Sequence, residues 1–149
     1  MKKVLFVCMG NICRSPMAQV VAQKMVADAG KAREFEFDSA GTHASRWGER
    51  PDPRAEDALT RRGYKVGRMR SRKIASKDFE QFDLILAMDA SNLAELQRLC
   101  QPEYLPKLRL LLECSKDLQE TDVPDPYYGS AKGFERVLDL CEIGVKGLL

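Results

Sequence analysis

Long apolar runs are missing from this chain of 149 residues. No stretch approaches the roughly 18 apolar residues that a membrane-spanning helix needs. The longest run near the start, residues 4–9, is also too short for the apolar part of a signal peptide. We therefore expect no membrane span and a protein that stays in the cytoplasm.

The chain also lacks the residue patterns of disulfide frameworks and zinc sites. Histidine occurs once, as His43, and one histidine can form neither a ligand set nor a triad alone, so we interpret it as a surface loop residue. The cysteines are odd in number and irregularly spaced: Cys8, Cys13, Cys100, Cys114 and Cys141. We expect free thiols and neither a metal nor another cofactor.

A strong excess of charge is absent as well. The 24 basic and 22 acidic side chains leave a net charge of +2, which gives no argument for a nucleic-acid or membrane partner, and we expect neither. The exception is residues 61–77, with eight basic and no acidic residues, which we interpret as a solvated face rather than a binding surface. A composition that is 44% hydrophobic and 31% charged excludes a disordered chain and predicts one globular domain over residues 1–149.

Short apolar strands alternate with amphipathic helices along the chain. The patterns predict strands at residues 2–8, 35–40, 82–88 and 108–112, and helices near 16–29, 53–63, 90–99 and 131–146. Ser15 and Asp52 are the predicted N-caps of the first two helices, each followed by a proline. This alternation is typical of a doubly wound α/β fold, here a small four-stranded parallel sheet with helices on both faces.

The loop after the first strand has the features of an anion site. It joins strand to helix in six residues, so its backbone N–H groups must curl inward toward the positive end of the helix dipole. Gly10 and Asn11 tolerate the backbone angles of such a curl, and the planar Arg14 side chain suits two phosphate oxygens at once. The loop lacks the Gly-Lys-Ser/Thr ending of nucleotide-binding loops, so a nucleoside triphosphate is not the expected ligand.

Cys8 stands at the mouth of this predicted loop. An ordinary thiol is only a few per cent ionised at neutral pH, but inward N–H groups, a helix N-terminus and Arg14 all favour the thiolate. We therefore predict that Cys8 is an ionised nucleophile directed at the bound anion. The alternative, a buried cysteine at a strand end, is disfavoured by the arginine six residues later and the Ser-Pro that opens the helix.

Two segments carry a resemblance to a known family. VLFVCMGNICRSPMA at residues 4–18 resembles the start of the low-molecular-weight protein tyrosine phosphatases, and DPYYG at 125–129 is similar to their acid loop. Weaker similarities are DSAGT at 38–42, PDPRA at 51–55 and MDASNL at 88–93. The segments follow the family's order along nearly the whole chain, which makes the match specific.

The resemblance implies a mechanism that agrees with the chemistry of the residues. Cys8 attacks the phosphorus of a phosphotyrosine, while Arg14 and the loop amides hold the equatorial oxygens. Asp125 protonates the leaving oxygen and then serves as the base that activates water. Ser15 hydrogen-bonds the sulfur, a role compatible with capping, and Asn11 and Ser39 brace the loop. The implied substrate-binding residues are Met9, Gly10, Asn11, Ile12, Cys13, Trp47 and Tyr127.

Some assignments have rivals in the sequence. Asp52 has the same Pro-Asp-Pro context as Asp125, but its capping role is a sufficient explanation, and Asp122 is a weaker second candidate. Trp47 and Tyr127 are expected to wall a slot for a phenyl ring, with partial core burial as the alternative for Trp47.

The loop itself leaves two questions open. Cys13 either forms a reversible disulfide with Cys8 after oxidation or packs as a small apolar group. The family often has a histidine shortly before the arginine that Arg72 matches, whereas Met69 and Arg70 stand there in this chain. The bracing behind Asn11 is therefore expected to differ from the family's.

Three other functions compete with phosphotyrosine hydrolysis. Arsenate reductases resemble the first loop, but Cys100 and Cys114 match their short cysteine relay poorly. Protein arginine phosphatases usually have threonine where this chain has Ile12, and a branched apolar side chain favours an aryl ester. A module that binds phosphorylated partners without turnover is the third alternative. We favour hydrolysis of tyrosine-phosphorylated proteins by a monomer.

Overall fold

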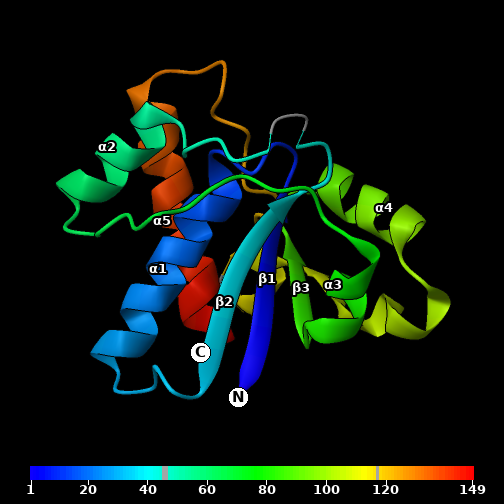
Figure 1. The fold of residues 1–149 in the computed structure, drawn as a ribbon. Helices are drawn as coiled ribbons and strands as arrows, with labels where there is room; N and C mark the ends of the chain where they lie inside the picture. The colour runs from blue at the N-terminus through cyan, green and yellow to red at the C-terminus, as the bar shows by residue number, and fades with distance from the viewer. Residues whose placement is uncertain (45–46, 117) are drawn as a thin grey trace.

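The computed structural model describes residues 1–44, 47–116 and 118–149, and a parallel sheet forms the centre of that part (Figure 1). Its four strands lie in the order β2-β1-β3-β4, and every neighbouring pair is parallel. The strands are β1 (Lys2–Cys8), β2 (Phe35–Gly41), β3 (Leu84–Ala87) and β4 (Leu108–Leu110). In β1 the four residues 4–7 are fully buried, because helices cover both faces of the sheet.

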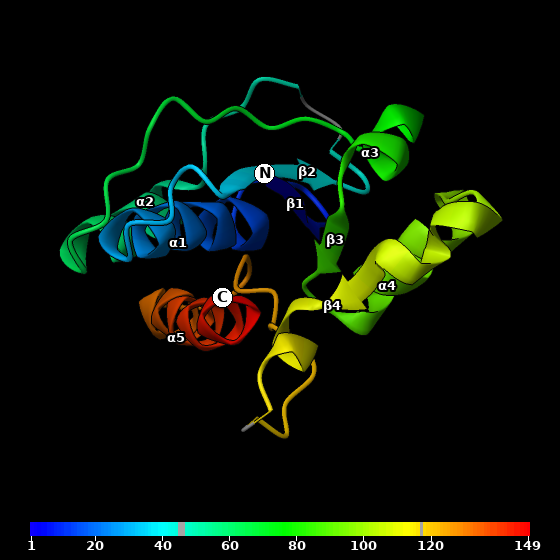
Figure 2. The ribbon, with the colours of Figure 1, turned by 90° about the horizontal axis from the view of Figure 1, so that it is seen from below.

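Helices cover the sheet in two layers (Figure 2). On one face lie α1 (Arg14–Asp28) and α5 (Ala131–Leu148), with α2 (Pro53–Arg61) packed against α5. On the other lie α3 (Ser76–Gln81) and α4 (Ala90–Leu99). Side chains alternate along β1, so that Val4 and Phe6 join the first apolar core and Leu5 and Val7 join the second. These layers confirm the predicted doubly wound α/β fold.

The starts of the first two helices test the predicted caps. Asp52 does cap α2, because its Oδ1 accepts a hydrogen bond of 2.9 Å from the N–H of Arg54. The prediction for Ser15 was wrong: α1 begins at Arg14 after Cys13, and Ser15 lies inside the first turn. The Ser15 hydroxyl therefore does not cap α1 and instead contacts the sulfur of Cys8.

The structure also contains short elements that the sequence patterns did not predict. These are α3 and two 3₁₀ helices, η1 (Pro102–Lys107) and η2 (Leu111–Cys114). The predicted last strand was too long, because Leu111 and Leu112 turn into η2 and pack beneath α5. Elements of four to six residues show too little of a helical period to be recognised.

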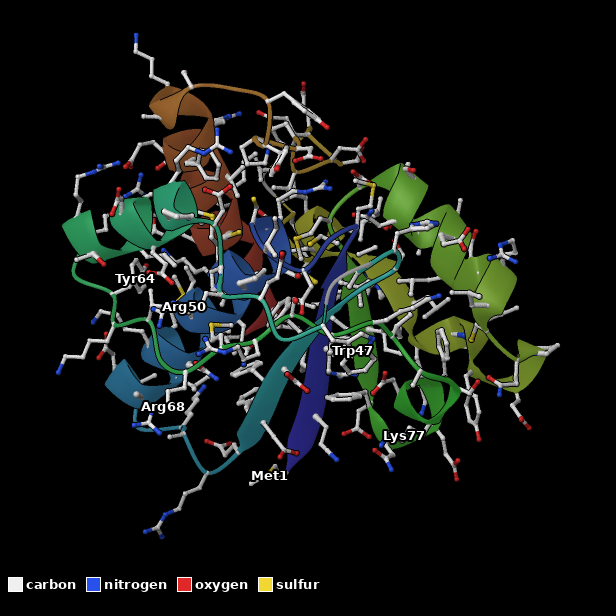
Figure 3. The ribbon with its side chains drawn as sticks, turned by 45° about the horizontal axis from the view of Figure 1, so that its top comes forward. Met1, Trp47, Arg50, Tyr64, Arg68 and Lys77 are labelled. Atoms are coloured by element: carbon white, nitrogen blue, oxygen red, sulfur yellow. The ribbon has the colours of Figure 1, made fainter. Side chains whose placement is uncertain are left out.

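The basic stretch at residues 61–77 crosses outside α1 and β2 between α2 and α3 (Figure 1). Its basic side chains divide into two groups. Arg61, Arg62 and Arg72 form ion pairs with carboxylates of neighbouring elements. Others, including the labelled Arg68 and Lys77, extend into solvent (Figure 3). The predicted solvated face therefore holds for part of the stretch, while its paired arginines fasten it to the fold.

We expect Arg62→Ala to destabilise the packing of α2 on α5. Arg62 pairs with Glu135 and Asp139 at 2.8 Å and with Glu142 at 2.5 Å, and these carboxylates raise the pKa of Arg62 although burial opposes the charge. Loss of this network should lower the free energy of unfolding by about 1–2 kcal/mol in urea titrations. The control Arg61→Ala, which removes a more exposed pair with Glu135, should change it by less than about 0.5 kcal/mol. Equal changes in both variants would refute the network.

Candidate active site

A pocket of about 380 Å³ lies where β1 ends and α1 begins. Three segments meet at this end of the sheet: the loop after β1, the loop after β2 and the segment that precedes α5 (Figure 1). The carboxyl ends of parallel strands are where doubly wound sheets place their ligands. The residues that line the pocket are Cys8, Met9, Gly10, Ile12, Cys13, Arg14, His43, Glu49, Asp125, Tyr127 and Tyr128.

The sulfur of Cys8 is surrounded by hydrogen-bonding groups. Cys8 is only 3% exposed, and the backbone N–H of Asn11 donates to its Sγ at 3.3 Å. The Oγ of Ser15 lies 3.0 Å from the same sulfur. Ser15 Oγ also accepts a hydrogen bond of 2.8 Å from Asn11 Nδ2 and donates one of 3.4 Å to the carbonyl oxygen of Ala40. The sulfur of Cys8 is therefore held among polar groups at the start of α1.

The side chain of Asn11 braces the loop from behind. Asn11 has a φ of 58°, in the left-handed region, and its Nδ2 donates to Ser15 Oγ and to Ser39 Oγ. Its Oδ1 accepts a hydrogen bond of 3.0 Å from the backbone N–H of Arg72. The structure thus confirms the predicted contacts of Asn11 and Ser39. A backbone amide completes the network, so no side chain is needed at Met69 or Arg70.

Close packing behind the loop leads to a prediction for Gly41→Ala. Gly41 pairs with Cys8 in the sheet, and a Cβ there would lie 2.6 Å from the carbonyl oxygen of Met9 and 3.1 Å from the nitrogen of Asn11. The loop would have to shift, and a displacement of about 1 Å at a reacting group costs on the order of 10²-fold in rate. We expect kcat to fall by that order. The control Gly67→Ala, where no atom lies within 4 Å of the new Cβ, should retain activity; an equal loss there would contradict the argument.

Arg14 is held in the floor of the pocket by two acceptors. It is 3% exposed, and its Nη1 donates to Asp89 Oδ2 at 2.5 Å and to the carbonyl oxygen of Val123 at 3.0 Å. Burial disfavours its charge, but the nearby Cys8 and Asp89 outweigh that effect and raise the pKa of Arg14. A cation that stays charged in a fixed orientation can bind two phosphate oxygens.

Asp89 is a functional residue that the sequence reasoning missed. Its Oδ1 accepts a hydrogen bond of 2.7 Å from Asn92 N at the start of α4, while its Oδ2 binds Arg14. An aspartate directly before a helix is typical of an N-cap. The sequence position of Asp89 therefore indicated capping and gave no sign of the contact with Arg14. The similarity of residues 88–93 to the phosphatase family was the available indication.

Of the three candidate acids, Asp125 is the one that lines the pocket with Cys8. Its side chain is 40% exposed, and its Oδ2 lies 3.8 Å from Arg14 Nη2. Asp52 is engaged by Arg54, and Asp122 accepts a hydrogen bond from Ala90 N. Neither of these two lines the pocket. The preference for Asp125 over both rivals therefore agrees with the placement of the three side chains.

Cys13 lines the same pocket but differs chemically from Cys8. Burial, together with the nearby carboxylate of Asp52, raises the pKa of Cys13 to about 12. Cys13 therefore remains a protonated thiol at neutral pH, and it packs in the first apolar core. All five cysteines are free, as predicted. A disulfide between Cys8 and Cys13 after oxidation stays a prediction.

The structure does not bring Trp47 to the pocket. Trp47 is 69% exposed and borders a separate hollow between β2 and α3, with its position marked in Figure 3. This exposure also contradicts the alternative for Trp47, partial core burial. Tyr127 does line the Cys8 pocket, together with Tyr128, Glu49 and His43, which the sequence did not assign to the site. His43 is an exposed loop residue, as predicted.

The fold and the pocket define a doubly wound α/β protein in which a cysteine and an arginine line one pocket at the carboxyl end of the first strand. Comparison with known proteins identifies the family. The family model described as low molecular weight phosphotyrosine protein phosphatase matches residues 3–149. The chain therefore belongs to this family, as the motifs at its two ends predicted.

Individual relatives are similar over most of their length. The low molecular weight protein-tyrosine-phosphatase of Streptomyces coelicolor is 43% identical over 150 residues, covering 99% of this chain and 91% of that protein. The human low molecular weight phosphotyrosine protein phosphatase is 40% identical over 141 residues, covering 94% and 89%. The crystal structure of a protein tyrosine phosphatase from Entamoeba histolytica has a TM-score of 0.95 at 40% identity, covering 99% and 94%.

Proposed function

We propose that this protein hydrolyses phosphotyrosine, and small aryl phosphates, through a phosphocysteine intermediate on Cys8. The observation that carries the proposal is the meeting of a nucleophile, an anion-binding arginine and an acid in one pocket: Cys8, Arg14 and Asp125. Membership of the phosphotyrosine phosphatase family supports the substrate class.

In the first step, the Cys8 thiolate attacks the phosphorus in line with the phenolic oxygen. A sulfur–phosphorus bond forms as the phosphorus–oxygen bond breaks. Arg14 and the N–H groups of residues 9–14 hold the three other oxygens as charge shifts among them. Asp125, in its protonated form, transfers a proton to the departing phenolate oxygen, so that a neutral phenol leaves.

In the second step, a water molecule attacks the phosphocysteine. The Asp125 carboxylate accepts a proton from this water, and the sulfur–phosphorus bond breaks to release inorganic phosphate. The leaving group is the Cys8 thiolate. Its departure is assisted by the hydroxyl of Ser15 and the N–H of Asn11, which contact this sulfur. The active site thereby returns to its starting protonation state.

The walls of the pocket favour an aryl ester. Tyr127, Ile12 and Met9 place aromatic and apolar surface beside the phosphate loop. Met9 is half exposed at the mouth, and Ile12 is partly buried. A phenyl ring can pack against this surface, whereas a phosphoserine side chain is too short to use it. Tyrosine-phosphorylated proteins are therefore the proposed substrates.

Arsenate reduction finds no support in the arrangement of the cysteines. Cys100 ends α4, where its thiol contacts the carbonyl oxygen of Gln101, and Cys114 lies in η2. Neither lines the pocket that contains Cys8. A relay that passes oxidation from Cys8 to these thiols would need them next to the pocket.

Hydrolysis assays test the proposal directly. The purified protein should release phosphate from p-nitrophenyl phosphate and from a phosphotyrosine peptide in the presence of EDTA, with vanadate as an inhibitor. A phosphoserine peptide of matched sequence should be a poor substrate. Binding of the phosphotyrosine peptide without turnover would refute catalysis and favour a binding module, and loss of activity in EDTA would show that a metal is required.

Two smaller proposals concern the setting of the protein. A cytoplasmic location and a monomeric state both stay predictions from the sequence. Within residues 1–44, 47–116 and 118–149, no helix has the length and apolarity required to cross a membrane. Size-exclusion chromatography with light scattering would test the monomer.

A further inference from the structure

The loop that carries Asp125 projects from the body of the protein. We define residues 123–130 as the acid loop. At its start, Val123 is anchored by a backbone hydrogen bond to Met88 and by Arg14. Beyond that point Pro126 is buried, but the other residues of the loop are exposed, with Tyr128 95% accessible to solvent. A general acid must stay within hydrogen-bonding reach of the leaving oxygen, so a loop of this kind needs a second anchor.

Arg54, the second residue of α2, supplies that anchor. Its Nη2 donates to the carbonyl oxygen of Tyr127 at 2.8 Å, and its Nη1 donates to that of Gly129 at 3.3 Å. Among the described residues, Arg54 is the one side chain outside the acid loop that donates hydrogen bonds to residues 124–130. The two carbonyl groups lie two and four residues beyond Asp125, so Arg54 fixes the far side of the turn that presents the carboxyl group.

Arg54 is itself fixed before it reaches the loop. The Asp52 carboxylate accepts from Arg54 Nε at 3.1 Å and from Nη2 at 3.0 Å, in a two-point pairing that orients the guanidinium plane. These hydrogen bonds also lower the pKa of Asp52, so the pair stays charged at neutral pH. The guanidinium carbon lies 4.7 Å from the ring centre of Phe134 and 5.6 Å from that of Tyr127. Phe134 is fully buried in α5 and forms a rigid support.

We propose that Arg54 is a positioning residue for general acid catalysis, holding the acid loop so that Asp125 meets the leaving oxygen. The inference rests on the proposed function, because it needs Asp125 to be the proton donor. It assigns Arg54 no contact with the substrate. The Asp52–Arg54 pair then has two roles, since it both caps α2 and transmits the position of that helix to the acid loop.

The dependence on the leaving group distinguishes this role from a general structural one. A phenolate that is a strong base needs protonation as it departs, whereas p-nitrophenolate leaves readily without it. We therefore expect Arg54→Ala to lower kcat/KM on the order of tenfold or more for phenyl phosphate, and only about twofold for p-nitrophenyl phosphate. Across a series of aryl phosphates, log kcat/KM should fall more steeply with the pKa of the leaving phenol than in the wild type.

A double-mutant cycle with Asp125→Asn tests whether Arg54 acts through the acid. Asp125→Asn alone should give the steepest dependence on the leaving group. Adding Arg54→Ala to that variant should change kcat/KM less than about twofold. Once residue 125 carries no acid, a change in its position no longer affects proton transfer to the leaving group. Arg54→Lys, which retains a charge but not the planar fork, should resemble Arg54→Ala. The control Arg50→Ala removes an exposed pair with Glu56 and should leave the series unchanged.

The outcomes separate the two proposals. An equal loss for all leaving groups in both Arg54 variants, or a full multiplicative loss on top of Asp125→Asn, would overturn the positioning role. Thermal melting of each variant shows whether the fold is intact, and Arg54→Lys preserves the test if Arg54→Ala does not fold. If Asp125→Asn itself leaves the dependence unchanged, the assignment of the acid fails instead, and with it the proposed mechanism.

Discussion

Replacement Cys8→Ser is expected to lower kcat by a factor on the order of 10⁵ or more for both p-nitrophenyl phosphate and phosphotyrosine. A serine hydroxyl is not ionised at neutral pH, and no other group in the pocket replaces the thiolate as nucleophile. Arg14 and the loop amides remain, so the variant should still bind phosphate or vanadate. Steady-state assays together with binding by calorimetry would measure both effects.

The other cysteines provide matched controls for this result. Cys100→Ser changes a thiol outside the pocket and should leave kcat unchanged. Cys13→Ser changes a protonated thiol inside the pocket and should cost far less than Cys8→Ser. If Cys8→Ser retained full activity while Cys13→Ser lost it, the nucleophile would be Cys13 and the mechanism as drawn would be wrong.

The second large effect is expected for Arg14→Lys, which should lower kcat on the order of 10³-fold or more. The guanidinium of Arg14 is oriented by Asp89 and by the carbonyl oxygen of Val123, leaving its outer face for the phosphate. A lysine ammonium is a point charge that cannot bind two oxygens in one plane, so transition-state stabilisation is lost although the charge is kept.

The kinetic constants show which role Arg14 has. A lower kcat with a modest change in KM indicates an interaction that strengthens in the transition state. A higher KM with unchanged kcat would contradict this role and reduce Arg14 to a binding group. The control Arg109→Lys, on an exposed position of β4, should match the wild type in both constants.

The sequence predicted the parts of the site that are local in the chain. The loop at residues 8–14 joins a strand to a helix, so its backbone geometry and the approach of Arg14 to Cys8 follow from a few neighbouring residues. Asp125 was found through the resemblance of its segment to the phosphatase acid loop. The placement of Ser15 was half right, because it contacts the sulfur as expected but lies inside α1.

The missed features depend on contacts between distant segments. Asp89 reaches Arg14 across 75 residues of chain, and Arg54 reaches Tyr127 across 73. Each of these residues lies at the start of a helix, where a local role already accounts for it. The sequence pattern therefore gives no indication of the contact with the distant segment. Trp47 was misplaced for a related reason: an aromatic residue in a loop indicates recognition, but the path of the loop decides which hollow it borders.

The central claim is that Cys8 is the reactive nucleophile of the pocket. The most direct measurement is the rate of alkylation by iodoacetamide at each cysteine at neutral pH, read by mass spectrometry of the peptides. We predict that Cys8 is alkylated first and that vanadate protects it, while Cys13 and Cys141, whose pKa values are both raised to about 12, stay unmodified. Alkylation of Cys8 that is no faster than that of Cys100, which lies outside the pocket, would contradict the account.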